Sequence, residues 1–204
     1  MSAIDTIQRQ GVIAIVRESS TDRAIKVTRQ LISAGVRAVE ISLVTPGATR
    51  AISECREAAP AGVDIGVGTV MTADELARAV DSGATFAIAP VLSKSLVRRA
   101  VNDAIPFIPG VGTATEAVEA MGEGASMVKL FPASIWSPAA MADLLTALPR
   151  LPFVPTGGIA LSAAPSWISA GATAVGLGGA LSRVAGTHAA VHSLLESIAV
   201  SRVK

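Results

Sequence analysis

The stretch 12-VIAIVRESSTDRAIKVTRQLISAGVRAVEISL-43 sets a pattern that the rest of the chain repeats. It begins and ends with short runs, 12–17 and 38–43, that are apolar on both faces apart from Arg17, Glu40 and Ser42. Runs of this kind are typical of parallel strands that are buried on both faces. Residues 21–35, between them, have the apolar spacing of an amphipathic helix that begins at the capping residue Thr21 and ends at Gly35. The stretch therefore predicts a strand, a helix and a second, parallel strand.

The same alternation continues to the end of the chain. Further apolar runs occupy residues 64–69, 85–90, 106–111, 127–131, 153–158 and 174–179. Helical patterns such as 73–83 separate them, and Thr72, Ser162, Gly83 and Gly171 are expected to mark helix ends.

Units of about 25 residues that alternate strand and helix close most economically into a (β/α)₈ TIM barrel. We therefore expect an α/β protein with a single barrel domain over residues 1–204. The alternative, a doubly wound open sheet, would usually have a glycine fingerprint after its first strand. The corresponding turn, 17-RESSTD-22, contains no glycine.

Composition excludes several classes of partner. The 17 Lys and Arg balance 16 Asp and Glu, and this net charge of +1 argues against binding to nucleic acid or an anionic membrane surface. A single cysteine excludes a disulfide framework and a cysteine-based zinc site, and fits a reducing compartment. The uncharged stretch 151–182 exceeds the ~20 residues of a membrane-spanning helix, but its prolines and glycines would break one. We expect a soluble, cytoplasmic protein.

Two predicted strands carry a charged residue inside an apolar run. Lys129 lies within 127-MVKLF-131, and Glu40 is the only carboxylate inside a predicted strand. A lysine that is removed from water can form a Schiff base with a carbonyl substrate, and a carboxylate beside it can move protons. The alternatives are a lysine whose amine reaches out to water, or an ion pair of the two that serves structure alone.

Weaker candidates lie at other strand ends, where barrels place their active sites. Arg17 is suited to a substrate carboxylate, and Thr69 offers a hydroxyl. The turns 156-TGGI-159 and 176-GLGG-179 are suited to a phosphate, which backbone N–H groups would hold, although tight turns alone also explain these glycines. His188 and His192 lack a third ligand, so no metal site is expected.

Seven motifs give the chain a resemblance that runs from about residue 7 to the end. They are 13-IAIVR-17, 39-VEISL-43, 66-GVGT-69, 87-AIAP-90, 109-PGVGTATE-116, 128-VKLFPAS-134 and 155-PTGGI-159. In these the chain resembles the pyruvate-dependent class I aldolases of the 2-keto-3-deoxy-6-phosphogluconate (KDPG) and 4-hydroxy-2-oxoglutarate (KHG) type, including the phosphogalactonate branch. The resemblance implies a homotrimeric barrel that uses no metal and no organic cofactor.

The resemblance also implies a role for individual residues. It makes Lys129 the Schiff-base lysine and Glu40 the acid and base, with Arg17 holding the carboxylate of pyruvate. The remaining residues implied to bind substrate are Thr69, Pro90, Thr156, Gly157, Gly158, Gly178 and Gly179. Two positions depart from the pattern. Val44 stands where some relatives have arginine, and 178-GGAL-181 lacks the serine that relatives commonly place in the last turn.

These observations predict an aldolase that cleaves KDPG to pyruvate and glyceraldehyde 3-phosphate, with small molecules as its only substrates. 2-Keto-3-deoxy-6-phosphogalactonate and 4-hydroxy-2-oxoglutarate are alternative substrates. A phosphosugar isomerase or epimerase on the same barrel is a different enzyme class, and a barrel that only binds a small acid is a third possibility.

Overall fold

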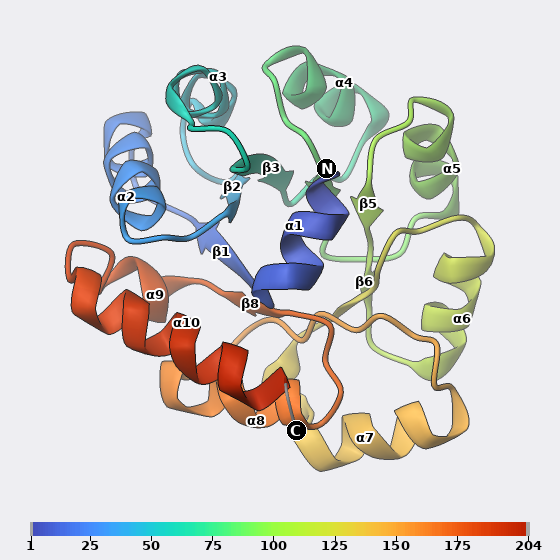
Figure 1. Ribbon diagram of the computed structural model, residues 1–204. Coiled ribbons are helices and arrows are strands. Elements are labelled where there is room, and N and C mark those ends of the chain that lie inside the picture. The colour runs from blue at the N-terminus through green and yellow to red at the C-terminus, as the bar shows by residue number, and fades with distance from the viewer. Residues whose placement is uncertain (1, 203–204) are drawn as a thin grey trace.

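The computed structural model describes residues 2–202, in which strands and helices alternate (Figure 1). The strands are β1 (Val12–Val16), β2 (Ala38–Ser42), β3 (Asp64–Gly68), β4 (Ala87–Ile88), β5 (Phe107–Ile108), β6 (Gly110–Val111), β7 (Lys129–Leu130) and β8 (Val175–Leu177). The α-helices are α1 (Ala3–Gln10), α2 (Thr21–Ser33), α3 (Ala48–Ala58), α4 (Ala73–Asp81), α5 (Lys94–Asn102), α6 (Ala114–Gly122), α7 (Pro138–Ala147), α8 (Ala164–Ser169), α9 (Gly179–Ser182) and α10 (His188–Arg202). Short 3₁₀ turns occupy η1 (Ala133–Ile135) and η2 (Leu161–Ala163).

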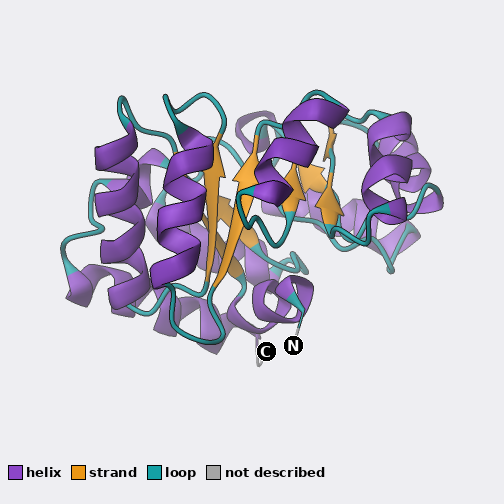
Figure 2. Cartoon of the chain, turned by 90° about the horizontal axis from the view of Figure 1, so that it is seen from above, coloured by secondary structure: helices purple, strands orange, loops and turns teal. Residues whose placement is uncertain are grey.

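The strands lie side by side inside a layer of helices (Figure 2), and their pairings close a parallel barrel. One sheet has the order β5-β4-β3-β2-β1-β8, and β6 pairs with β7. The segment 153–156 completes the ring, because Phe153 bridges to Val128 and Thr156 bridges to Gly176 of β8. The predicted barrel is thus confirmed, and each of the eight apolar runs contributes to it.

Prolines explain why two of these runs are irregular. Proline has no N–H to donate to a ladder, and Pro109 separates β5 from β6. Pro152 and Pro155 likewise remove donors from the seventh run, which joins its neighbours through single bridges rather than a regular ladder. Val154 N still donates to Val128 O at 2.8 Å, and Thr156 N donates to Leu130 O at 3.0 Å.

Helix α1, which the sequence did not lead us to expect, closes one end of the barrel. Figure 1 looks onto this end, with α1 lying across it. Ala3 and Ile7 of α1 pack against the residues that fill the barrel, namely Ile13, Ala38, Phe86, Ile88, Ile108, Met127, Val154 and Ala174. Since Ala38 begins β2, and Met127 and Ala174 precede β7 and β8, α1 covers the amino ends of the strands and leaves the carboxyl ends for the site.

Helices α2 and α4 are close to their predicted ranges, but two predicted caps are wrong. The cap of α2 is Ser20, whose hydroxyl accepts from Arg23 N, whereas Thr21 Oγ1 donates to Pro46 O at 2.7 Å. Ser162 lies inside η2, and α8 follows it without a side-chain cap. The predicted Thr72 cap of α4 is confirmed.

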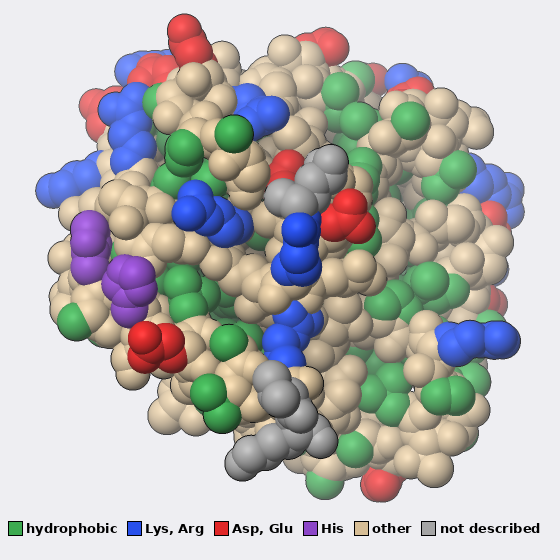
Figure 3. Space-filling model, in the orientation of Figure 1, with side chains coloured by type: hydrophobic (Ala, Val, Ile, Leu, Met, Phe, Trp, Pro, Cys, Tyr) green, Lys and Arg blue, Asp and Glu red, His purple; other side chains and the backbone are tan. Residues whose placement is uncertain are grey.

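The surface agrees with the balanced charge of the sequence. Positive and negative side chains are mixed around the edge of the face shown in Figure 3. Within residues 2–202, no helix is both long and apolar enough to cross a membrane.

Candidate active site

Glu40 of β2 and Lys129 of β7 point into the barrel. Side chains alternate along a strand, so Glu40 shares a face with Ala38 and Lys129 shares one with Met127, and both of these apolar residues belong to the barrel interior. Glu40 is only 1% exposed and Lys129 only 6% exposed. The two charged side chains therefore form the next layer of the interior, toward the carboxyl ends of the strands.

Glycines make room for this charged layer. Gly68 of β3 faces Glu40 so closely that a Cβ on Gly68 would overlap the carboxyl group. Gly110 pairs with Lys129 in the β6–β7 ladder, and Gly176 leaves space for the Thr156 side chain. A side chain at Gly68 would take the space of the Glu40 carboxyl group, whereas one at Gly110 would meet the Pro90 carbonyl group and one at Gly176 would meet the Thr156 side chain.

This close approach gives a prediction for stability. Gly68→Ala is expected to lower the free energy of unfolding by about 1–3 kcal/mol, because the new methyl group must displace a buried carboxyl group. Gly122→Ala, at the end of α6, is the matched control, because a Cβ there meets nothing within 4 Å. It should raise stability by up to about 1 kcal/mol. Urea unfolding of both variants measures the difference, and equal stabilities would contradict the prediction.

Burial is the dominant influence on Glu40. It raises the pKa of this carboxyl, while the positive charges of Lys129 and Arg17 lower the pKa by smaller amounts. Glu40 Oε2 has no hydrogen-bond partner among residues 2–202, and no ion pair in this range joins Glu40 to Lys129. The structure thus does not show the purely structural ion pair considered above, and the carboxyl can take up and release a proton nearer to neutral pH.

Phe131 belongs to the site, although sequence reasoning did not single it out. Lys129 Nζ lies 4.9 Å from the centre of the Phe131 ring. The ring also lies against the turn after the seventh run, since a Cβ on Gly157 would be 3.1 Å from it. Phe131 is two residues beyond Lys129 and so shares its strand face, and this spacing could have predicted from the sequence that Phe131 belongs to the site. Phe131 therefore forms an apolar wall between the lysine and this turn.

The predicted threonines and proline line the layer around these residues. Thr69 follows β3 with a φ of +64°, which is unusual for a β-branched residue, and its Oγ1 is 2.8 Å from the Oγ of buried Ser42. Thr156 is buried and its Oγ1 donates to Val154 O at 3.1 Å. The carbonyl group of Pro90 packs against Gly110. Ser42 is a further residue that the sequence analysis missed.

Arg17 and the glycine turns lie at the rim. Arg17 follows β1 directly, and the next residue is fixed because Glu18 N donates to Thr45 Oγ1 at 3.1 Å. Gly157 and Gly158 have φ values of +98° and +78°, which favour glycine over other residues. Gly178 and Gly179 form the turn from β8 into α9. These rim positions thus follow strands at the same end of the barrel, whereas Glu40 and Lys129 lie within strands β2 and β7.

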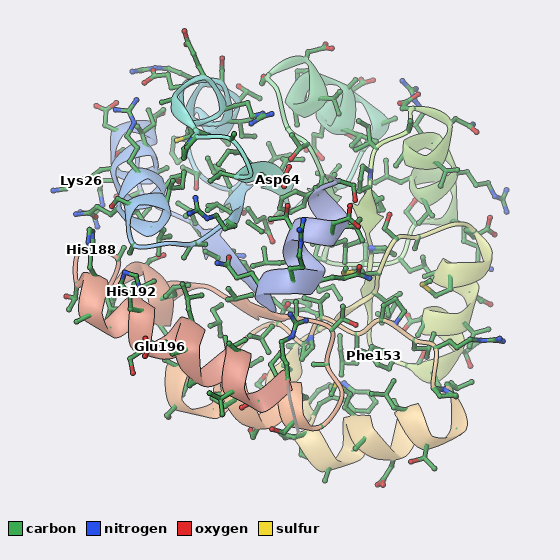
Figure 4. All side chains as sticks on the ribbon, viewed as in Figure 1. Lys26, Asp64, Phe153, His188, His192 and Glu196 are labelled. Carbon is green, nitrogen blue, oxygen red and sulfur yellow. The ribbon has the colours of Figure 1, made fainter. Side chains whose placement is uncertain are left out.

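The residues set aside earlier lie elsewhere. His188 and His192 project from α10 on the outside of the barrel, near Lys26 of α2 (Figure 4), and His188 Nε2 is 3.1 Å from Ser33 Oγ. Residues 2–202 contain no group of three side chains suited to a metal ion.

Burial raises the pKa of the Cys55 thiol, which disfavours a reactive thiolate. A hollow of about 570 Å³ beside the loop 148–152 contains none of the candidate residues.

Comparisons with known proteins agree on one family. The family profile described as KDPG and KHG aldolase matches residues 4–192. The 2-dehydro-3-deoxy-phosphogluconate aldolase of Treponema pallidum is 34% identical over 166 residues, which are 79% of this chain and 77% of that protein. A probable 2-dehydro-3-deoxy-6-phosphogalactonate aldolase of Rhizobium meliloti is 34% identical over 83% of this chain and 81% of its own.

Solved structures agree with the sequence comparisons. The crystal structure of KDPG aldolase from Legionella pneumophila, with pyruvate captured at low pH as a covalent carbinolamine intermediate, superposes with a TM-score of 0.80. The match covers 98% of each chain at 26% sequence identity.

Proposed function

Since this chain belongs to the KDPG and KHG aldolase family, we propose that its own reaction is the cleavage of KDPG to pyruvate and glyceraldehyde 3-phosphate. The chain is an aldolase, a carbon–carbon lyase. One observation carries the assignment of residues: a lysine and a carboxyl group, both almost fully buried, share one layer of the barrel interior beside the strand ends. Nothing in a packed core requires such a pair, whereas Schiff-base chemistry does.

The proposed reaction begins when the unprotonated amine of Lys129 attacks C2 of the keto acid. The carbinolamine that forms loses water, with Glu40 supplying the proton to the departing hydroxyl, and leaves an iminium ion. Glu40, now ionised, removes the proton of the C4 hydroxyl, and the C3–C4 bond breaks. Its electrons move into the iminium ion, which becomes an enamine, and the aldehyde is released. Protonation of the enamine at C3 and hydrolysis then return pyruvate and free Lys129.

The surrounding residues would hold the substrate during these steps. A guanidinium matches a carboxylate in two parallel hydrogen bonds, which suits Arg17 to the acid end of the substrate. Thr69 and Thr156 offer hydroxyl groups, and Pro90 and Phe131 limit the site with apolar surface. The N–H groups of the turns at Gly157, Gly158, Gly178 and Gly179 suit a phosphate. No step in this scheme requires a metal or an organic cofactor.

Alternative substrates lie within the same family. 2-Keto-3-deoxy-6-phosphogalactonate differs from KDPG in configuration at C4, and a relative named for it is among the similar proteins. 4-Hydroxy-2-oxoglutarate would release a smaller aldehyde without phosphate, and a relative is named for both activities. Family membership does not support the isomerase or the purely binding alternative, since it indicates carbon–carbon bond cleavage.

We also propose a cytoplasmic homotrimer. The trimer is expected from the family resemblance, and exposed apolar side chains beside the barrel mouth support it. These are Val44, Met71, Val91 and Ile135, with exposed fractions of 61, 51, 47 and 74%. Val44, Met71 and Val91 follow the neighbouring strands β2, β3 and β4, and exposed apolar side chains on one part of a surface are typical of interfaces. Sedimentation that finds only monomer would contradict this assembly.

Borohydride trapping tests the reaction class. The protein is incubated with pyruvate, reduced, digested and mapped by mass spectrometry, and a reduced pyruvyl adduct is expected on Lys129. Release of pyruvate from KDPG, its C4 epimer and 4-hydroxy-2-oxoglutarate is then compared. We expect KDPG to give the highest kcat/KM. An adduct on another lysine, or none on folded protein, would overturn the assignment of Lys129.

A further inference from the structure

The rim of the barrel mouth has little charge near its last three strands. The turns that follow these strands, 131–138, 156–163 and 178–182, contain no Lys, Arg, Asp or Glu. The first charged residue after the last of these turns is Arg183, directly beyond α9. A substrate anion on this side of the mouth would therefore meet one cationic side chain and no acidic competitor from these turns.

The Arg183 side chain reaches back over the start of the last turn. Helical side chains lean toward the amino end of their helix, and Arg183 Nη1 lies 3.5 Å from where a Cβ on Gly179 would be. Because Gly179 has no side chain, nothing from that residue shields the guanidinium. Arg183 is exposed, and among residues 2–202 it makes no side-chain hydrogen bond or ion pair. Its five N–H donors are available to a ligand.

Arg17 and Arg183 occupy different depths of neighbouring strand ends. Gly178 lies against Ile15, two residues before Arg17, and β1 pairs with β8. Arg17 directly follows β1 and its charge lowers the pKa of Glu40, whereas Arg183 follows β8 only after the turn and α9. Arg17 is thus the inner cation, next to the reacting groups, and Arg183 is the outer one. A 2-keto-3-deoxy-6-phospho acid has its carboxylate next to the reacting ketone and its phosphate at the far end.

From this arrangement we infer that Arg183 determines specificity by binding the phosphate of the aldehyde portion of the substrate. This inference rests on the proposed aldolase function. Residues 178-GGAL-181, at the start of the last turn, have no hydroxyl to offer a phosphate, and the guanidinium supplies two parallel hydrogen bonds and a full positive charge instead. The chain consequently keeps a preference for phosphorylated aldehydes.

The test compares two aldehydes in the condensation direction, with pyruvate as the common partner. For each variant, kcat/KM is measured with D-glyceraldehyde 3-phosphate and with D-glyceraldehyde, and their ratio reports on phosphate selection. Loss of a charged hydrogen-bond donor is worth about 10- to 100-fold, so Arg183→Ala should lower this ratio by that factor, mainly through KM. Arg183→Lys should retain part of the preference for the phosphorylated aldehyde, because lysine keeps the positive charge but cannot form two parallel hydrogen bonds.

Arg150→Ala is the matched control. It removes the same charge from the exposed loop 148–152, at the amino ends of the strands, and should leave the ratio unchanged. If Arg183→Ala also leaves the ratio unchanged, or lowers both activities equally, the inference about Arg183 is wrong. Borohydride trapping of pyruvate on Lys129 separates the two claims. Normal trapping with an unchanged ratio rejects only the role of Arg183, and failure to trap on the unaltered chain rejects the proposed function.

Discussion

Lys129→Met is expected to lower kcat for KDPG cleavage by about four orders of magnitude or more, which is typical for loss of a covalent nucleophile. The reason is specific to the chemistry, because without the amine no iminium ion forms to accept the electrons of the C3–C4 bond. Methionine keeps the length and apolar stem of lysine, so it should fill the space beside Phe131 without opening a cavity. Steady-state release of pyruvate measures the effect, and circular dichroism verifies the fold.

Two further variants test whether activity depends on the amine of Lys129 as a nucleophile or only on its positive charge. Lys129→Arg keeps a cation near Glu40 but has no amine that can form a Schiff base, so it should be as inactive as Lys129→Met. Lys94→Met removes an exposed lysine of α5, whose Nζ is 3.0 Å from Glu119 Oε2. It should retain nearly full activity, because exposed ion pairs contribute little to stability. Substantial turnover by either Lys129 variant would mean that the lysine is not the nucleophile.

The barrel was predictable because its pattern is repeated along the chain. Strands that are buried on both faces must be apolar almost throughout, and this leaves a strong signal even where Pro109 or Pro155 interrupts the hydrogen-bond ladder. The same pattern made Lys129 and Glu40 conspicuous, since a charged side chain inside such a run is rarely buried unless it is paired or functional. Their place inside apolar strand runs was thus enough to identify both residues of the charged layer from the sequence.

Features that depend on contacts between distant segments were not predictable. Helix α1 looks like any short amphipathic helix, and only the fold places Ile7 against the interior of the barrel. Phe131 was counted as one more apolar strand residue, although its ring lies beside the Lys129 amine. The hydrogen bond of Ser42 to Thr69 joins side chains 27 positions apart. Alternation along one strand can place a residue on a face, but it does not identify its neighbours from other strands.

Glu40→Gln is expected to lower turnover by about 10²- to 10⁴-fold, the range typical for loss of a general acid and base. The amide has nearly the same shape, so Lys129 stays in place, and trapping of pyruvate by borohydride should persist at a reduced rate. Complete retention of kcat would show that another group moves the protons. Glu54→Gln, in an exposed pair with Arg50 on α3, is the control and should leave kcat unchanged.

The same substitution should stabilise the fold, and the dependence on pH identifies the cause. Burial raises the pKa of Glu40 in the folded state, so the folded protein holds this proton at pH values where the unfolded chain has released it. Between the ordinary glutamate pKa and the raised one, the original protein therefore loses stability as pH rises. Glu40→Gln avoids this loss. The advantage of the variant in urea unfolding should be absent well below the ordinary pKa, grow with pH across that window, and become constant above the raised pKa. An advantage that is independent of pH would instead indicate a difference in packing. A less active but more stable variant would mean that the buried carboxyl is retained for chemistry at the expense of the fold.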